Sequence, residues 1–211
     1  MRLKCYVIIL VGLSCLFSPC TASAKDSLDF LEQAFIISVR KGEFEQVNRF
    51  IESGINVNLK TPEGMTPLIW SVVAYQPHVF KLLLLNLKLV DDIDNNGYSA
   101  LMWAAKLGHA DMVDPLLKMK ARLDFKDYHM GWDALMIAVN HGNHEVVQLL
   151  LEAGASPNRQ DRFQWTPWAL AKSRNDVYLE ELLKKYGATE WLCRTSEIGP
   201  QGDIDCQNDY R

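Results

Sequence analysis

Apolar residues recur along most of the chain with a period of 33 or 34 residues. Within each period, one stretch carries apolar residues three and four positions apart, which is the spacing of one helix face. A second stretch carries small residues such as Ala104, Ala105 and Ala138, which allow a neighbouring helix to approach closely. Each period therefore predicts two short antiparallel helices, and because no pair can bury its apolar face alone, the pairs must stack into a solenoid. The apolar stripes are Val79, Phe80, Leu82 and Leu83; Met112, Val113, Leu116 and Leu117; and Val146, Val147, Leu149 and Leu150.

Other registers of the same period mark the helix boundaries. One register holds residue types whose side-chain oxygen caps a helix start by accepting an orphan backbone N–H. Proline follows two of these residues, at the favoured first helical position. A second register marks the break between the two helices of each pair. The extra residue of the single 34-residue period falls at the tip of a hairpin, in residues 127–131. The cap positions are Thr66, Ser99, Asp133 and Thr166, and the breaks are at Gly42, Tyr75, Gly108, Gly142 and Asn175.

These residues resemble the ankyrin-repeat pattern, G-x-T-P-L-x-x-A-A-x-x-G-H followed by V-V-x-x-L-L-x-x-G-A. The resemblance implies an all-α solenoid of helix-turn-helix units joined by hairpin loops, of an exported bacterial type. It spans about residues 27–189 as five repeats, at about 27–60, 61–93, 94–126, 127–160 and 161–189. The pattern is carried by Gly64, Thr66, Pro67 and Leu68; by Gly97, Ser99, Leu101, Ala104, Ala105, Gly108 and His109; and by Gly142, Glu145, Val146, Val147, Leu149, Leu150, Gly154 and Ala155.

The chain departs from the family pattern in two registers. Leu87 and Lys120 stand where a glycine usually ends the second helix in a left-handed conformation, at a cost of about 1 kcal/mol for a residue with a side chain. We therefore expect these two second helices to end differently from the others. Apolar or small residues also replace the histidine of the family's T-P-L-H, so the polar network of that histidine is absent. Its positions hold Ile69, Met102, Met136 and Ala169.

Residues 1–24 have the three parts of a secretory signal peptide. Arg2 and Lys4 form a short basic segment, an apolar run of twelve residues follows at 6–17, and Ala22 and Ala24 form an A-x-A cleavage site. The apolar run is shorter than the roughly 20 residues of a membrane-spanning helix. The sequence predicts an exported chain, periplasmic or secreted, that begins at Lys25 and has no membrane contact after cleavage. The repeat domain is then residues 25–189.

The predicted exported chain keeps two cysteines, Cys193 and Cys206, in the C-terminal tail at 190–211. Two cysteines in an exported chain suggest a disulfide bond. A bridge that closes a loop of this size would stabilise the fold by about 3 kcal/mol. The alternative is that the pair is redox-active, although it lacks the C-x-x-C spacing.

Charge and motifs narrow the possible functions. The chain has 22 Lys and Arg against 26 Asp and Glu, a net charge of −4, so the cationic surplus of a nucleic-acid binder is missing. His141 and His144 are separated by a turn, and the aspartates near Asp94 do not follow the spacing of a calcium loop. The sequence contains no phosphate loop, nucleophile elbow or zinc-protease motif. We therefore expect no catalytic residues, no metal and no cofactor, and a chain that is not an enzyme.

The family resemblance implies a binding surface on a concave groove, formed by the hairpin tips and the exposed face of the first helices. Met65, Tyr98, Trp132 and Trp165 place a large side chain at the same position of successive hairpins. These side chains either anchor a partner or pack against the base of the next hairpin. Trp70 and Trp103 occupy a different register and are expected to pack between repeats. The candidate partner-binding residues are Met65, Tyr98, Lys106, Tyr128, His129, Trp132, His141, Phe163, Trp165 and Arg174.

Two functions are compatible with these features. The first is an exported protein-binding module, monomeric when free, that inhibits, protects against or scaffolds a periplasmic protein, as an inhibitor or immunity protein does. The second is an accessory factor for oxidative-stress or redox proteins in the periplasm, with Cys193 and Cys206 active. The resistance of the cysteine pair to mild reductant would distinguish them.

Overall fold

The computed structural model describes residues 24–87 and 90–189, and this part of the chain contains ten α-helices. An isolated β-bridge joins Ile93 to Ser99 within one hairpin. The predicted all-α fold is confirmed. The first helices of the five pairs are α1 (Ala24–Lys41), α3 (Pro67–Val73), α5 (Ala100–Leu107), α7 (Ala134–His141) and α9 (Pro167–Ser173). The second helices are α2 (Phe44–Glu52), α4 (Pro77–Asn86), α6 (Ala110–Lys118), α8 (His144–Glu152) and α10 (Val177–Lys185).

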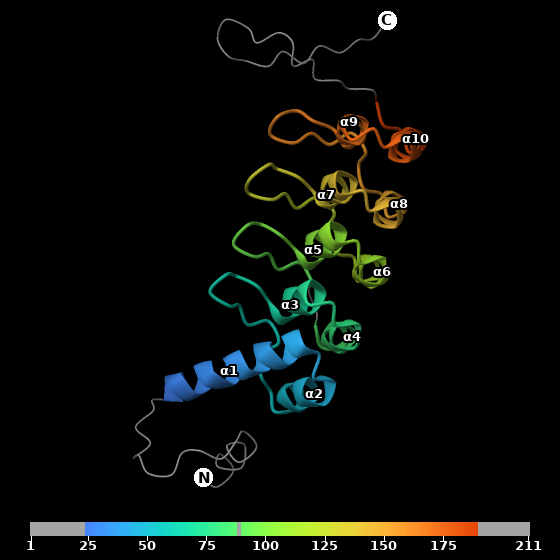
Figure 1. Cartoon of the computed structure of the whole chain (residues 1–211). Coiled ribbons are helices and arrows are strands. Elements are labelled where there is room, and N and C mark those ends of the chain that lie inside the picture. Colours follow the sequence, from blue (N-terminus) through green and yellow to red (C-terminus); the bar gives the residue numbers. More distant parts are fainter. Residues whose placement is uncertain (1–23, 88–89, 190–211) are drawn as a thin grey trace, which may run out of the picture.

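The helix pairs stack in chain order to form a solenoid (Figure 1). First helices pack on first helices, and second helices pack on second helices. The hairpin loops that precede α3, α5, α7 and α9 all project to the same side of the stack (Figure 1). The long helix α1 has no preceding hairpin in the described residues, and it runs in the direction in which the hairpins project.

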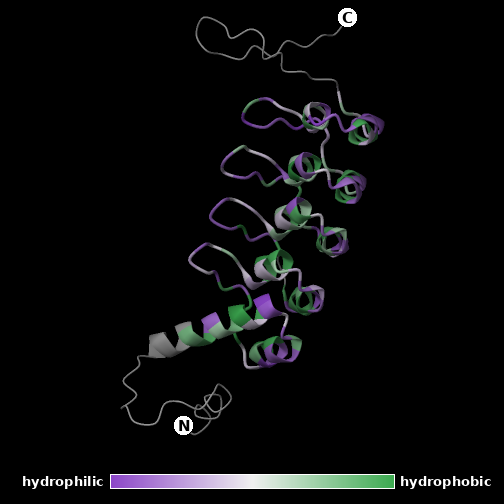
Figure 2. Cartoon of the chain, viewed as in Figure 1, coloured by the Kyte–Doolittle hydropathy of each residue, from purple (hydrophilic) through white to green (hydrophobic). Residues whose placement is uncertain are grey.

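One continuous apolar core runs through the stack between the helix layers. The predicted stripes supply it, because Val79, Met112 and Val146 and their neighbours are buried. The residues that replace the family's histidine, including Ile69, Met102 and Met136, are also fully or almost fully buried. Hydrophobic residues concentrate in the helices, whereas the hairpin loops are mainly hydrophilic (Figure 2). The solenoid therefore depends on burial between neighbouring repeats.

The predicted N-caps of the later first helices are confirmed. In each case the side-chain oxygen accepts the backbone N–H three residues further on, which satisfies one donor of the first helical turn. The donor to acceptor distances are 3.3 Å at Thr66, 3.2 Å at Ser99, 2.9 Å at Asp133 and 3.2 Å at Thr166.

The two second helices that lack the terminal glycine end in different ways. Leu87 is extended, with φ −102° and ψ 140°, so α4 ends as predicted without the left-handed residue. Lys120 keeps the left-handed conformation, with φ +60°, although its position is occupied by glycine in other repeats, as at Gly154. The expectation of a different ending is therefore correct for α4 and wrong for α6. An L-residue in this region carries steric strain.

Substitution of Lys120 by glycine is expected to stabilise the fold. Lys120→Gly removes the left-handed strain, and after the larger unfolded-state entropy of glycine is subtracted, the gain is about 0.5–1 kcal/mol. Lys120→Ala is the matched control, because it removes the side chain but keeps a Cβ at φ +60°. Urea unfolding followed by circular dichroism measures both. Equal stability of the two variants would show that the backbone strain at Lys120 is not significant.

Candidate functional site: the hairpin face

An aspartate at the base of each of the last three hairpins organises that hairpin from within. Asp94, Asp127 and Asp161 are buried, and the Oδ1 atom of each accepts backbone N–H groups of its own hairpin. Asp127 accepts three such bonds, from His129, Met130 and Gly131, at 2.7–2.9 Å. Asp94 and Asp161 accept two each. The inserted residue predicted at this tip is therefore accommodated by one more N–H on the same carboxylate oxygen.

The same aspartates tie the hairpins to aromatic side chains. Trp132 Nε1 donates to Asp161 Oδ2 of the next hairpin at 2.8 Å. Trp103 Nε1 of α5 donates to Asp94 Oδ2 at 2.9 Å. Burial of Tyr98, together with the nearby carboxylates of Asp127 in the next hairpin and of Asp94, raises the pKa of the tyrosine to about 12. The Tyr98 hydroxyl therefore stays protonated beside these carboxylates at physiological pH.

Backbone contacts fix the spacing between successive hairpins. Asn95 N–H donates to Glu63 O at 3.0 Å, Tyr128 N–H to Asn96 O at 2.9 Å, and Arg162 N–H to Met130 O at 3.0 Å. The Tyr128 ring lies against Gly97, where a Cβ would be 3.0 Å from the ring and 3.1 Å from Lys126 O. Gly97 also has φ +83°, so this tip requires glycine for both space and conformation. These bonds join the four hairpins in series, like the rungs of a ladder, and hold each one in a fixed position relative to the next.

Cationic side chains cover the aromatic rings beside the hairpins. The Arg40 guanidinium lies 4.4 Å from the centre of the Trp70 ring, and the Lys106 Nζ atom lies 4.8 Å from Trp103 and 5.2 Å from Tyr98. These contacts are within the range of cation–π attraction. We call the surface made by the hairpins and the last turns of the first helices the hairpin face. On it, Arg40 and Lys106 each lie over aromatic rings.

The structure corrects the prediction for Met65. Its side chain is only 8% exposed and belongs to the core, where a flexible apolar side chain packs well. Tyr98, Trp132 and Trp165 are half-buried and pack against the same core. For Tyr98 and Trp132, the alternative of packing against the next hairpin is the correct one, since Trp132 bonds to Asp161 and Tyr98 lies near Asp127, each in the next hairpin. The row of half-buried rings formed by Tyr98, Trp132 and Trp165 is therefore mainly structural.

The remaining predicted residues lie on or beside the hairpin face. Tyr128 and Phe163 are exposed at successive hairpin tips, by 53% and 49%. His129 Nε2 lies 3.3 Å from Asn96 Oδ1, which links its hairpin to the preceding one. His141 is exposed in the last turn of α7, with Nδ1 2.9 Å from Ile137 O.

Arg174 and Lys106 complete this set at the ends of the first helices. Arg174 is exposed at the C-cap of α9 and lies beside Gly142, the C-cap of α7. Lys106 lies in the last turn of α5. Trp70 and Trp103 are half-buried against the core, as expected for packing residues.

Sequence reasoning missed Arg40 and the three hairpin aspartates. The signal for both was the repeat register: Arg40 stands 66 residues before Lys106, and Asp94, Asp127 and Asp161 are spaced by 33 and 34 residues. The ring contact of Arg40 could not be predicted, because Trp70 lies in the next repeat.

The described part of the chain offers few other candidate sites for metal binding, catalysis or membrane insertion. Among the described residues, no three His, Cys, Asp or Glu side chains gather closely enough to hold a metal ion. His144 belongs to a separate contact at the turn between α7 and α8, with Nε2 2.7 Å from Asp176 Oδ2. None of the described helices is both long enough and apolar enough to cross a membrane. The predicted signal peptide, apart from its last residue, and the Cys193–Cys206 pair lie outside the described residues.

A pocket of about 680 Å³ lies away from the hairpin face, between α1 and α2. Its apolar lining includes Phe30, Ile37 and Phe44, which are exposed at the N-terminal end of the stack.

Comparison with known proteins agrees with the geometry. A family model of three ankyrin repeats matches residues 35–127, and a single-repeat model matches residues 130–162. The chain belongs to the ankyrin-repeat family. Ankyrin repeats are protein–protein interaction modules and are generally not enzymes.

Three relatives show how far the likeness extends. An ankyrin repeat-containing protein of Treponema pallidum is 31% identical over 160 residues, which cover 75% of this chain but 53% of that protein. The yeast protein named "Probable 26S proteasome regulatory subunit p28" is 32% identical, over 72% of this chain and 69% of its own length. The ankyrin repeat protein YahD of Escherichia coli is 28% identical, over 69% and 75%. The chain thus spans about half the length of the Treponema protein.

The bond between Trp132 and Asp161 is expected to support this ankyrin stack. Trp132→Phe keeps most of the ring but leaves Asp161 Oδ2 without its donor, so the free energy of unfolding should fall by about 1–2 kcal/mol. Trp132→Ala also removes the packed ring and should cost about 2–4 kcal/mol. Trp165→Phe is the matched control, because Trp165 donates no inter-hairpin bond within the described residues. Urea unfolding compares the three, and an equal loss for Trp132→Phe and Trp165→Phe would contradict the role of this bond.

Proposed function

We propose that this chain is an exported ankyrin-repeat module that binds a periplasmic protein through its hairpin face and thereby inhibits, protects against or scaffolds that partner. The observation that carries the proposal is a rigid ladder of hairpins with exposed large side chains at its tips. Tyr128 and Phe163 are held there by backbone bonds to Asn96 O and Asp161 Oδ1. Such preorganised tips lose little conformational entropy when they bind.

The division of roles within the hairpin face supports binding rather than chemistry. The half-buried rings of Tyr98 and Trp132 are used for stacking, whereas the rings of Tyr128 and Phe163 are exposed at the hairpin tips. The hairpin aspartates are also committed, because each accepts backbone N–H donors on Oδ1, and Asp94 and Asp161 accept a tryptophan N–H on Oδ2 as well. Aromatic residues at such exposed, rigid sites are typical of binding hot spots.

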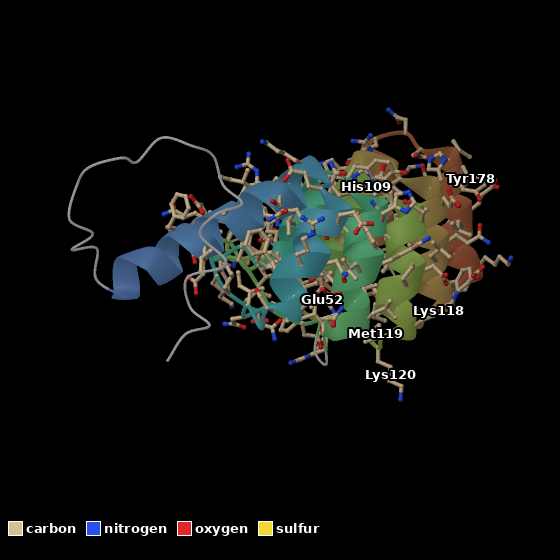
Figure 3. All side chains as sticks on the ribbon, turned by 90° about the horizontal axis from the view of Figure 1, so that it is seen from below. Glu52, His109, Lys118, Met119, Lys120 and Tyr178 are labelled. Carbon is tan, nitrogen blue, oxygen red and sulfur yellow. The ribbon has the colours of Figure 1, made fainter. Side chains whose placement is uncertain are left out.

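Two double variants test whether the hairpin face binds the partner. Tyr128→Ala with Phe163→Ala removes the exposed tip rings and should weaken partner binding at least about thirtyfold if each ring contributes about 1 kcal/mol or more. The control is Leu85→Ala with Met119→Ala, which removes two exposed apolar side chains on the second-helix side, 85% and 41% exposed. Met119 lies at an outer edge of the stack, next to Lys120 (Figure 3).

The measurement is affinity capture from the exported fraction of the source organism, followed by titration of the captured protein. Thermal melts establish that each variant is folded. Loss of the partner with the tip variant and its retention with the Leu85 and Met119 control support the proposal. The reverse result would move the binding site to the second helices.

Export is a separate part of the proposal and rests on the basic, apolar and A-x-A segments of residues 1–24. Expression of the full chain with subcellular fractionation is expected to yield an exported form that begins at Lys25. N-terminal sequencing and intact mass measure the cleavage site. A cell-associated form that retains residues 1–24 would contradict export by this route, while leaving protein binding by the hairpin face intact.

A further inference from the structure

Charge is distributed unevenly between the two helix layers. The first helices α3, α5, α7 and α9 contain no carboxylate, and their charged residues are Lys106 and Lys172. The second helices carry most of the helical carboxylates, for example Asp111 and Asp114 in α6. The chain as a whole is acidic, at −4. From α3 onward, the first helices therefore carry a net positive charge, opposite in sign to that of the whole chain.

In the described part of the chain, several cations of the hairpin face are ion-paired, namely Lys41, Lys60, Arg122, Arg159 and Lys172, but Arg40, Lys106 and Arg174 are not. Within the described residues, no carboxylate lies within 4 Å of Arg40, Lys106 or Arg174. Arg40 and Lys106 instead lie over aromatic rings, which leaves their full charge available. Arg40 and Lys106 also occupy the same register of the period, so they lie in the same last-turn position on α1 and α5. By contrast, Lys118 of α6 is paired with Asp114 at 2.6 Å.

Negative groups on the same face are few or occupied. Glu63 is the carboxylate of the described hairpin tips, and further along the hairpins Asp92 and Asp124 are paired with Lys60 and Arg122. The hairpin aspartates lie beneath the surface and accept hydrogen bonds, at Asp94 and Asp161 on both oxygens. A ligand that approaches the tips therefore meets aromatic edges and guanidinium or ammonium groups first.

Helix-dipole compensation accounts for only part of this arrangement. A cation in the last turn stabilises a helix C-terminus, and Arg40, Lys106 and Arg174 are all near such ends. That effect requires no aromatic ring beneath the cation. If helix-dipole compensation were the whole role of these cations, removing a charge would lower the stability of the fold and leave partner binding unchanged. Stability and binding measurements can therefore separate the two roles.

We propose that the partner presents an acidic polypeptide segment, whose carboxylates contact Arg40, Lys106 and Arg174 while its apolar side chains lie against the exposed tip rings. This inference rests on the proposed function and specifies the chemistry of its partner. Arginine and lysine side chains exposed on aromatic faces suit carboxylates, which they bind by charge-assisted hydrogen bonds.

A protein segment fits this surface better than a nucleic acid does. The total charge of −4 repels a long polyanion at distance, and the three unpaired cations are spread over repeats instead of forming a continuous basic track. A short acidic segment needs only the local positive charge and gains specificity from the aromatic contacts between the charges.

Paired charge variants of the chain 25–211 test the inference. The probe is a fluorescein-labelled oligo-glutamate peptide, with a labelled oligo-lysine peptide and a labelled oligothymidylate measured alongside by fluorescence anisotropy. Arg40→Gln with Lys106→Gln should weaken binding of oligo-glutamate about five- to tenfold. Lys81→Gln with Lys118→Gln removes the same total charge from the second helices and should change it less than about twofold. Binding of oligo-glutamate by the unchanged chain should also weaken as salt is raised.

Each other outcome overturns the inference. Equal losses for the two charge pairs would show a non-specific effect of net charge. Tighter, Arg40-dependent binding of oligothymidylate would assign the face to nucleic acid instead. A captured partner that is lost with Tyr128→Ala and Phe163→Ala but retained in full by Arg40→Gln with Lys106→Gln would refute the acidic segment and leave the proposed protein binding standing. Thermal melts of the variants separate a loss of helix-end stability from a loss of binding.

Discussion

Burial of apolar surface between neighbouring repeats is the interaction on which the rest of the molecule depends. A single helix pair exposes its stripe to water on both sides, so it gains little on its own, whereas a stack removes that surface from water at every junction. Fully buried Met102, Met136 and Leu150 show where this energy is gained. Because the helices are fixed by this packing, the hairpins emerge at regular intervals and on one side of the stack.

The hairpins are stabilised by a second, polar system that the core makes possible. Each buried aspartate satisfies amide donors of its own hairpin, and Asp94 and Asp161 each accept a further bond from a tryptophan. A carboxylate is costly to bury unless its oxygens are hydrogen-bonded, and here the donors are present in the same register of each repeat. Trp132 therefore links two hairpins, and its ring contributes mainly to packing within the stack. The rings of Tyr128 and Phe163, by contrast, are exposed at the hairpin tips.

The separation of charge follows from the same geometry. First helices pack between the hairpins and the second helices, so their few exposed positions are the last turns, where Arg40 and Lys106 lie over aromatic rings. The second helices have a broad solvated face and accommodate carboxylates such as Asp111 and Glu145. An acidic chain can thus present a cationic, aromatic surface on one side, which suits a partner whose own surface is acidic and apolar.

The sequence by itself determined the solenoid, the five helix pairs, the N-caps at residues such as Asp133 and the extra residue at the third hairpin tip, because these depend on local chemistry and on the period. Only the tertiary structure decided which side of an aromatic residue faces solvent. Met65 and Trp132 occupy one register, yet Met65 is buried in the core and Trp132 bonds to Asp161 in the following repeat. The contact of Arg40 with Trp70 likewise joins two repeats. A periodic sequence predicts that neighbouring repeats pack together. Which atoms come into contact depends on the side chains of both repeats, so it is decided only in the tertiary structure.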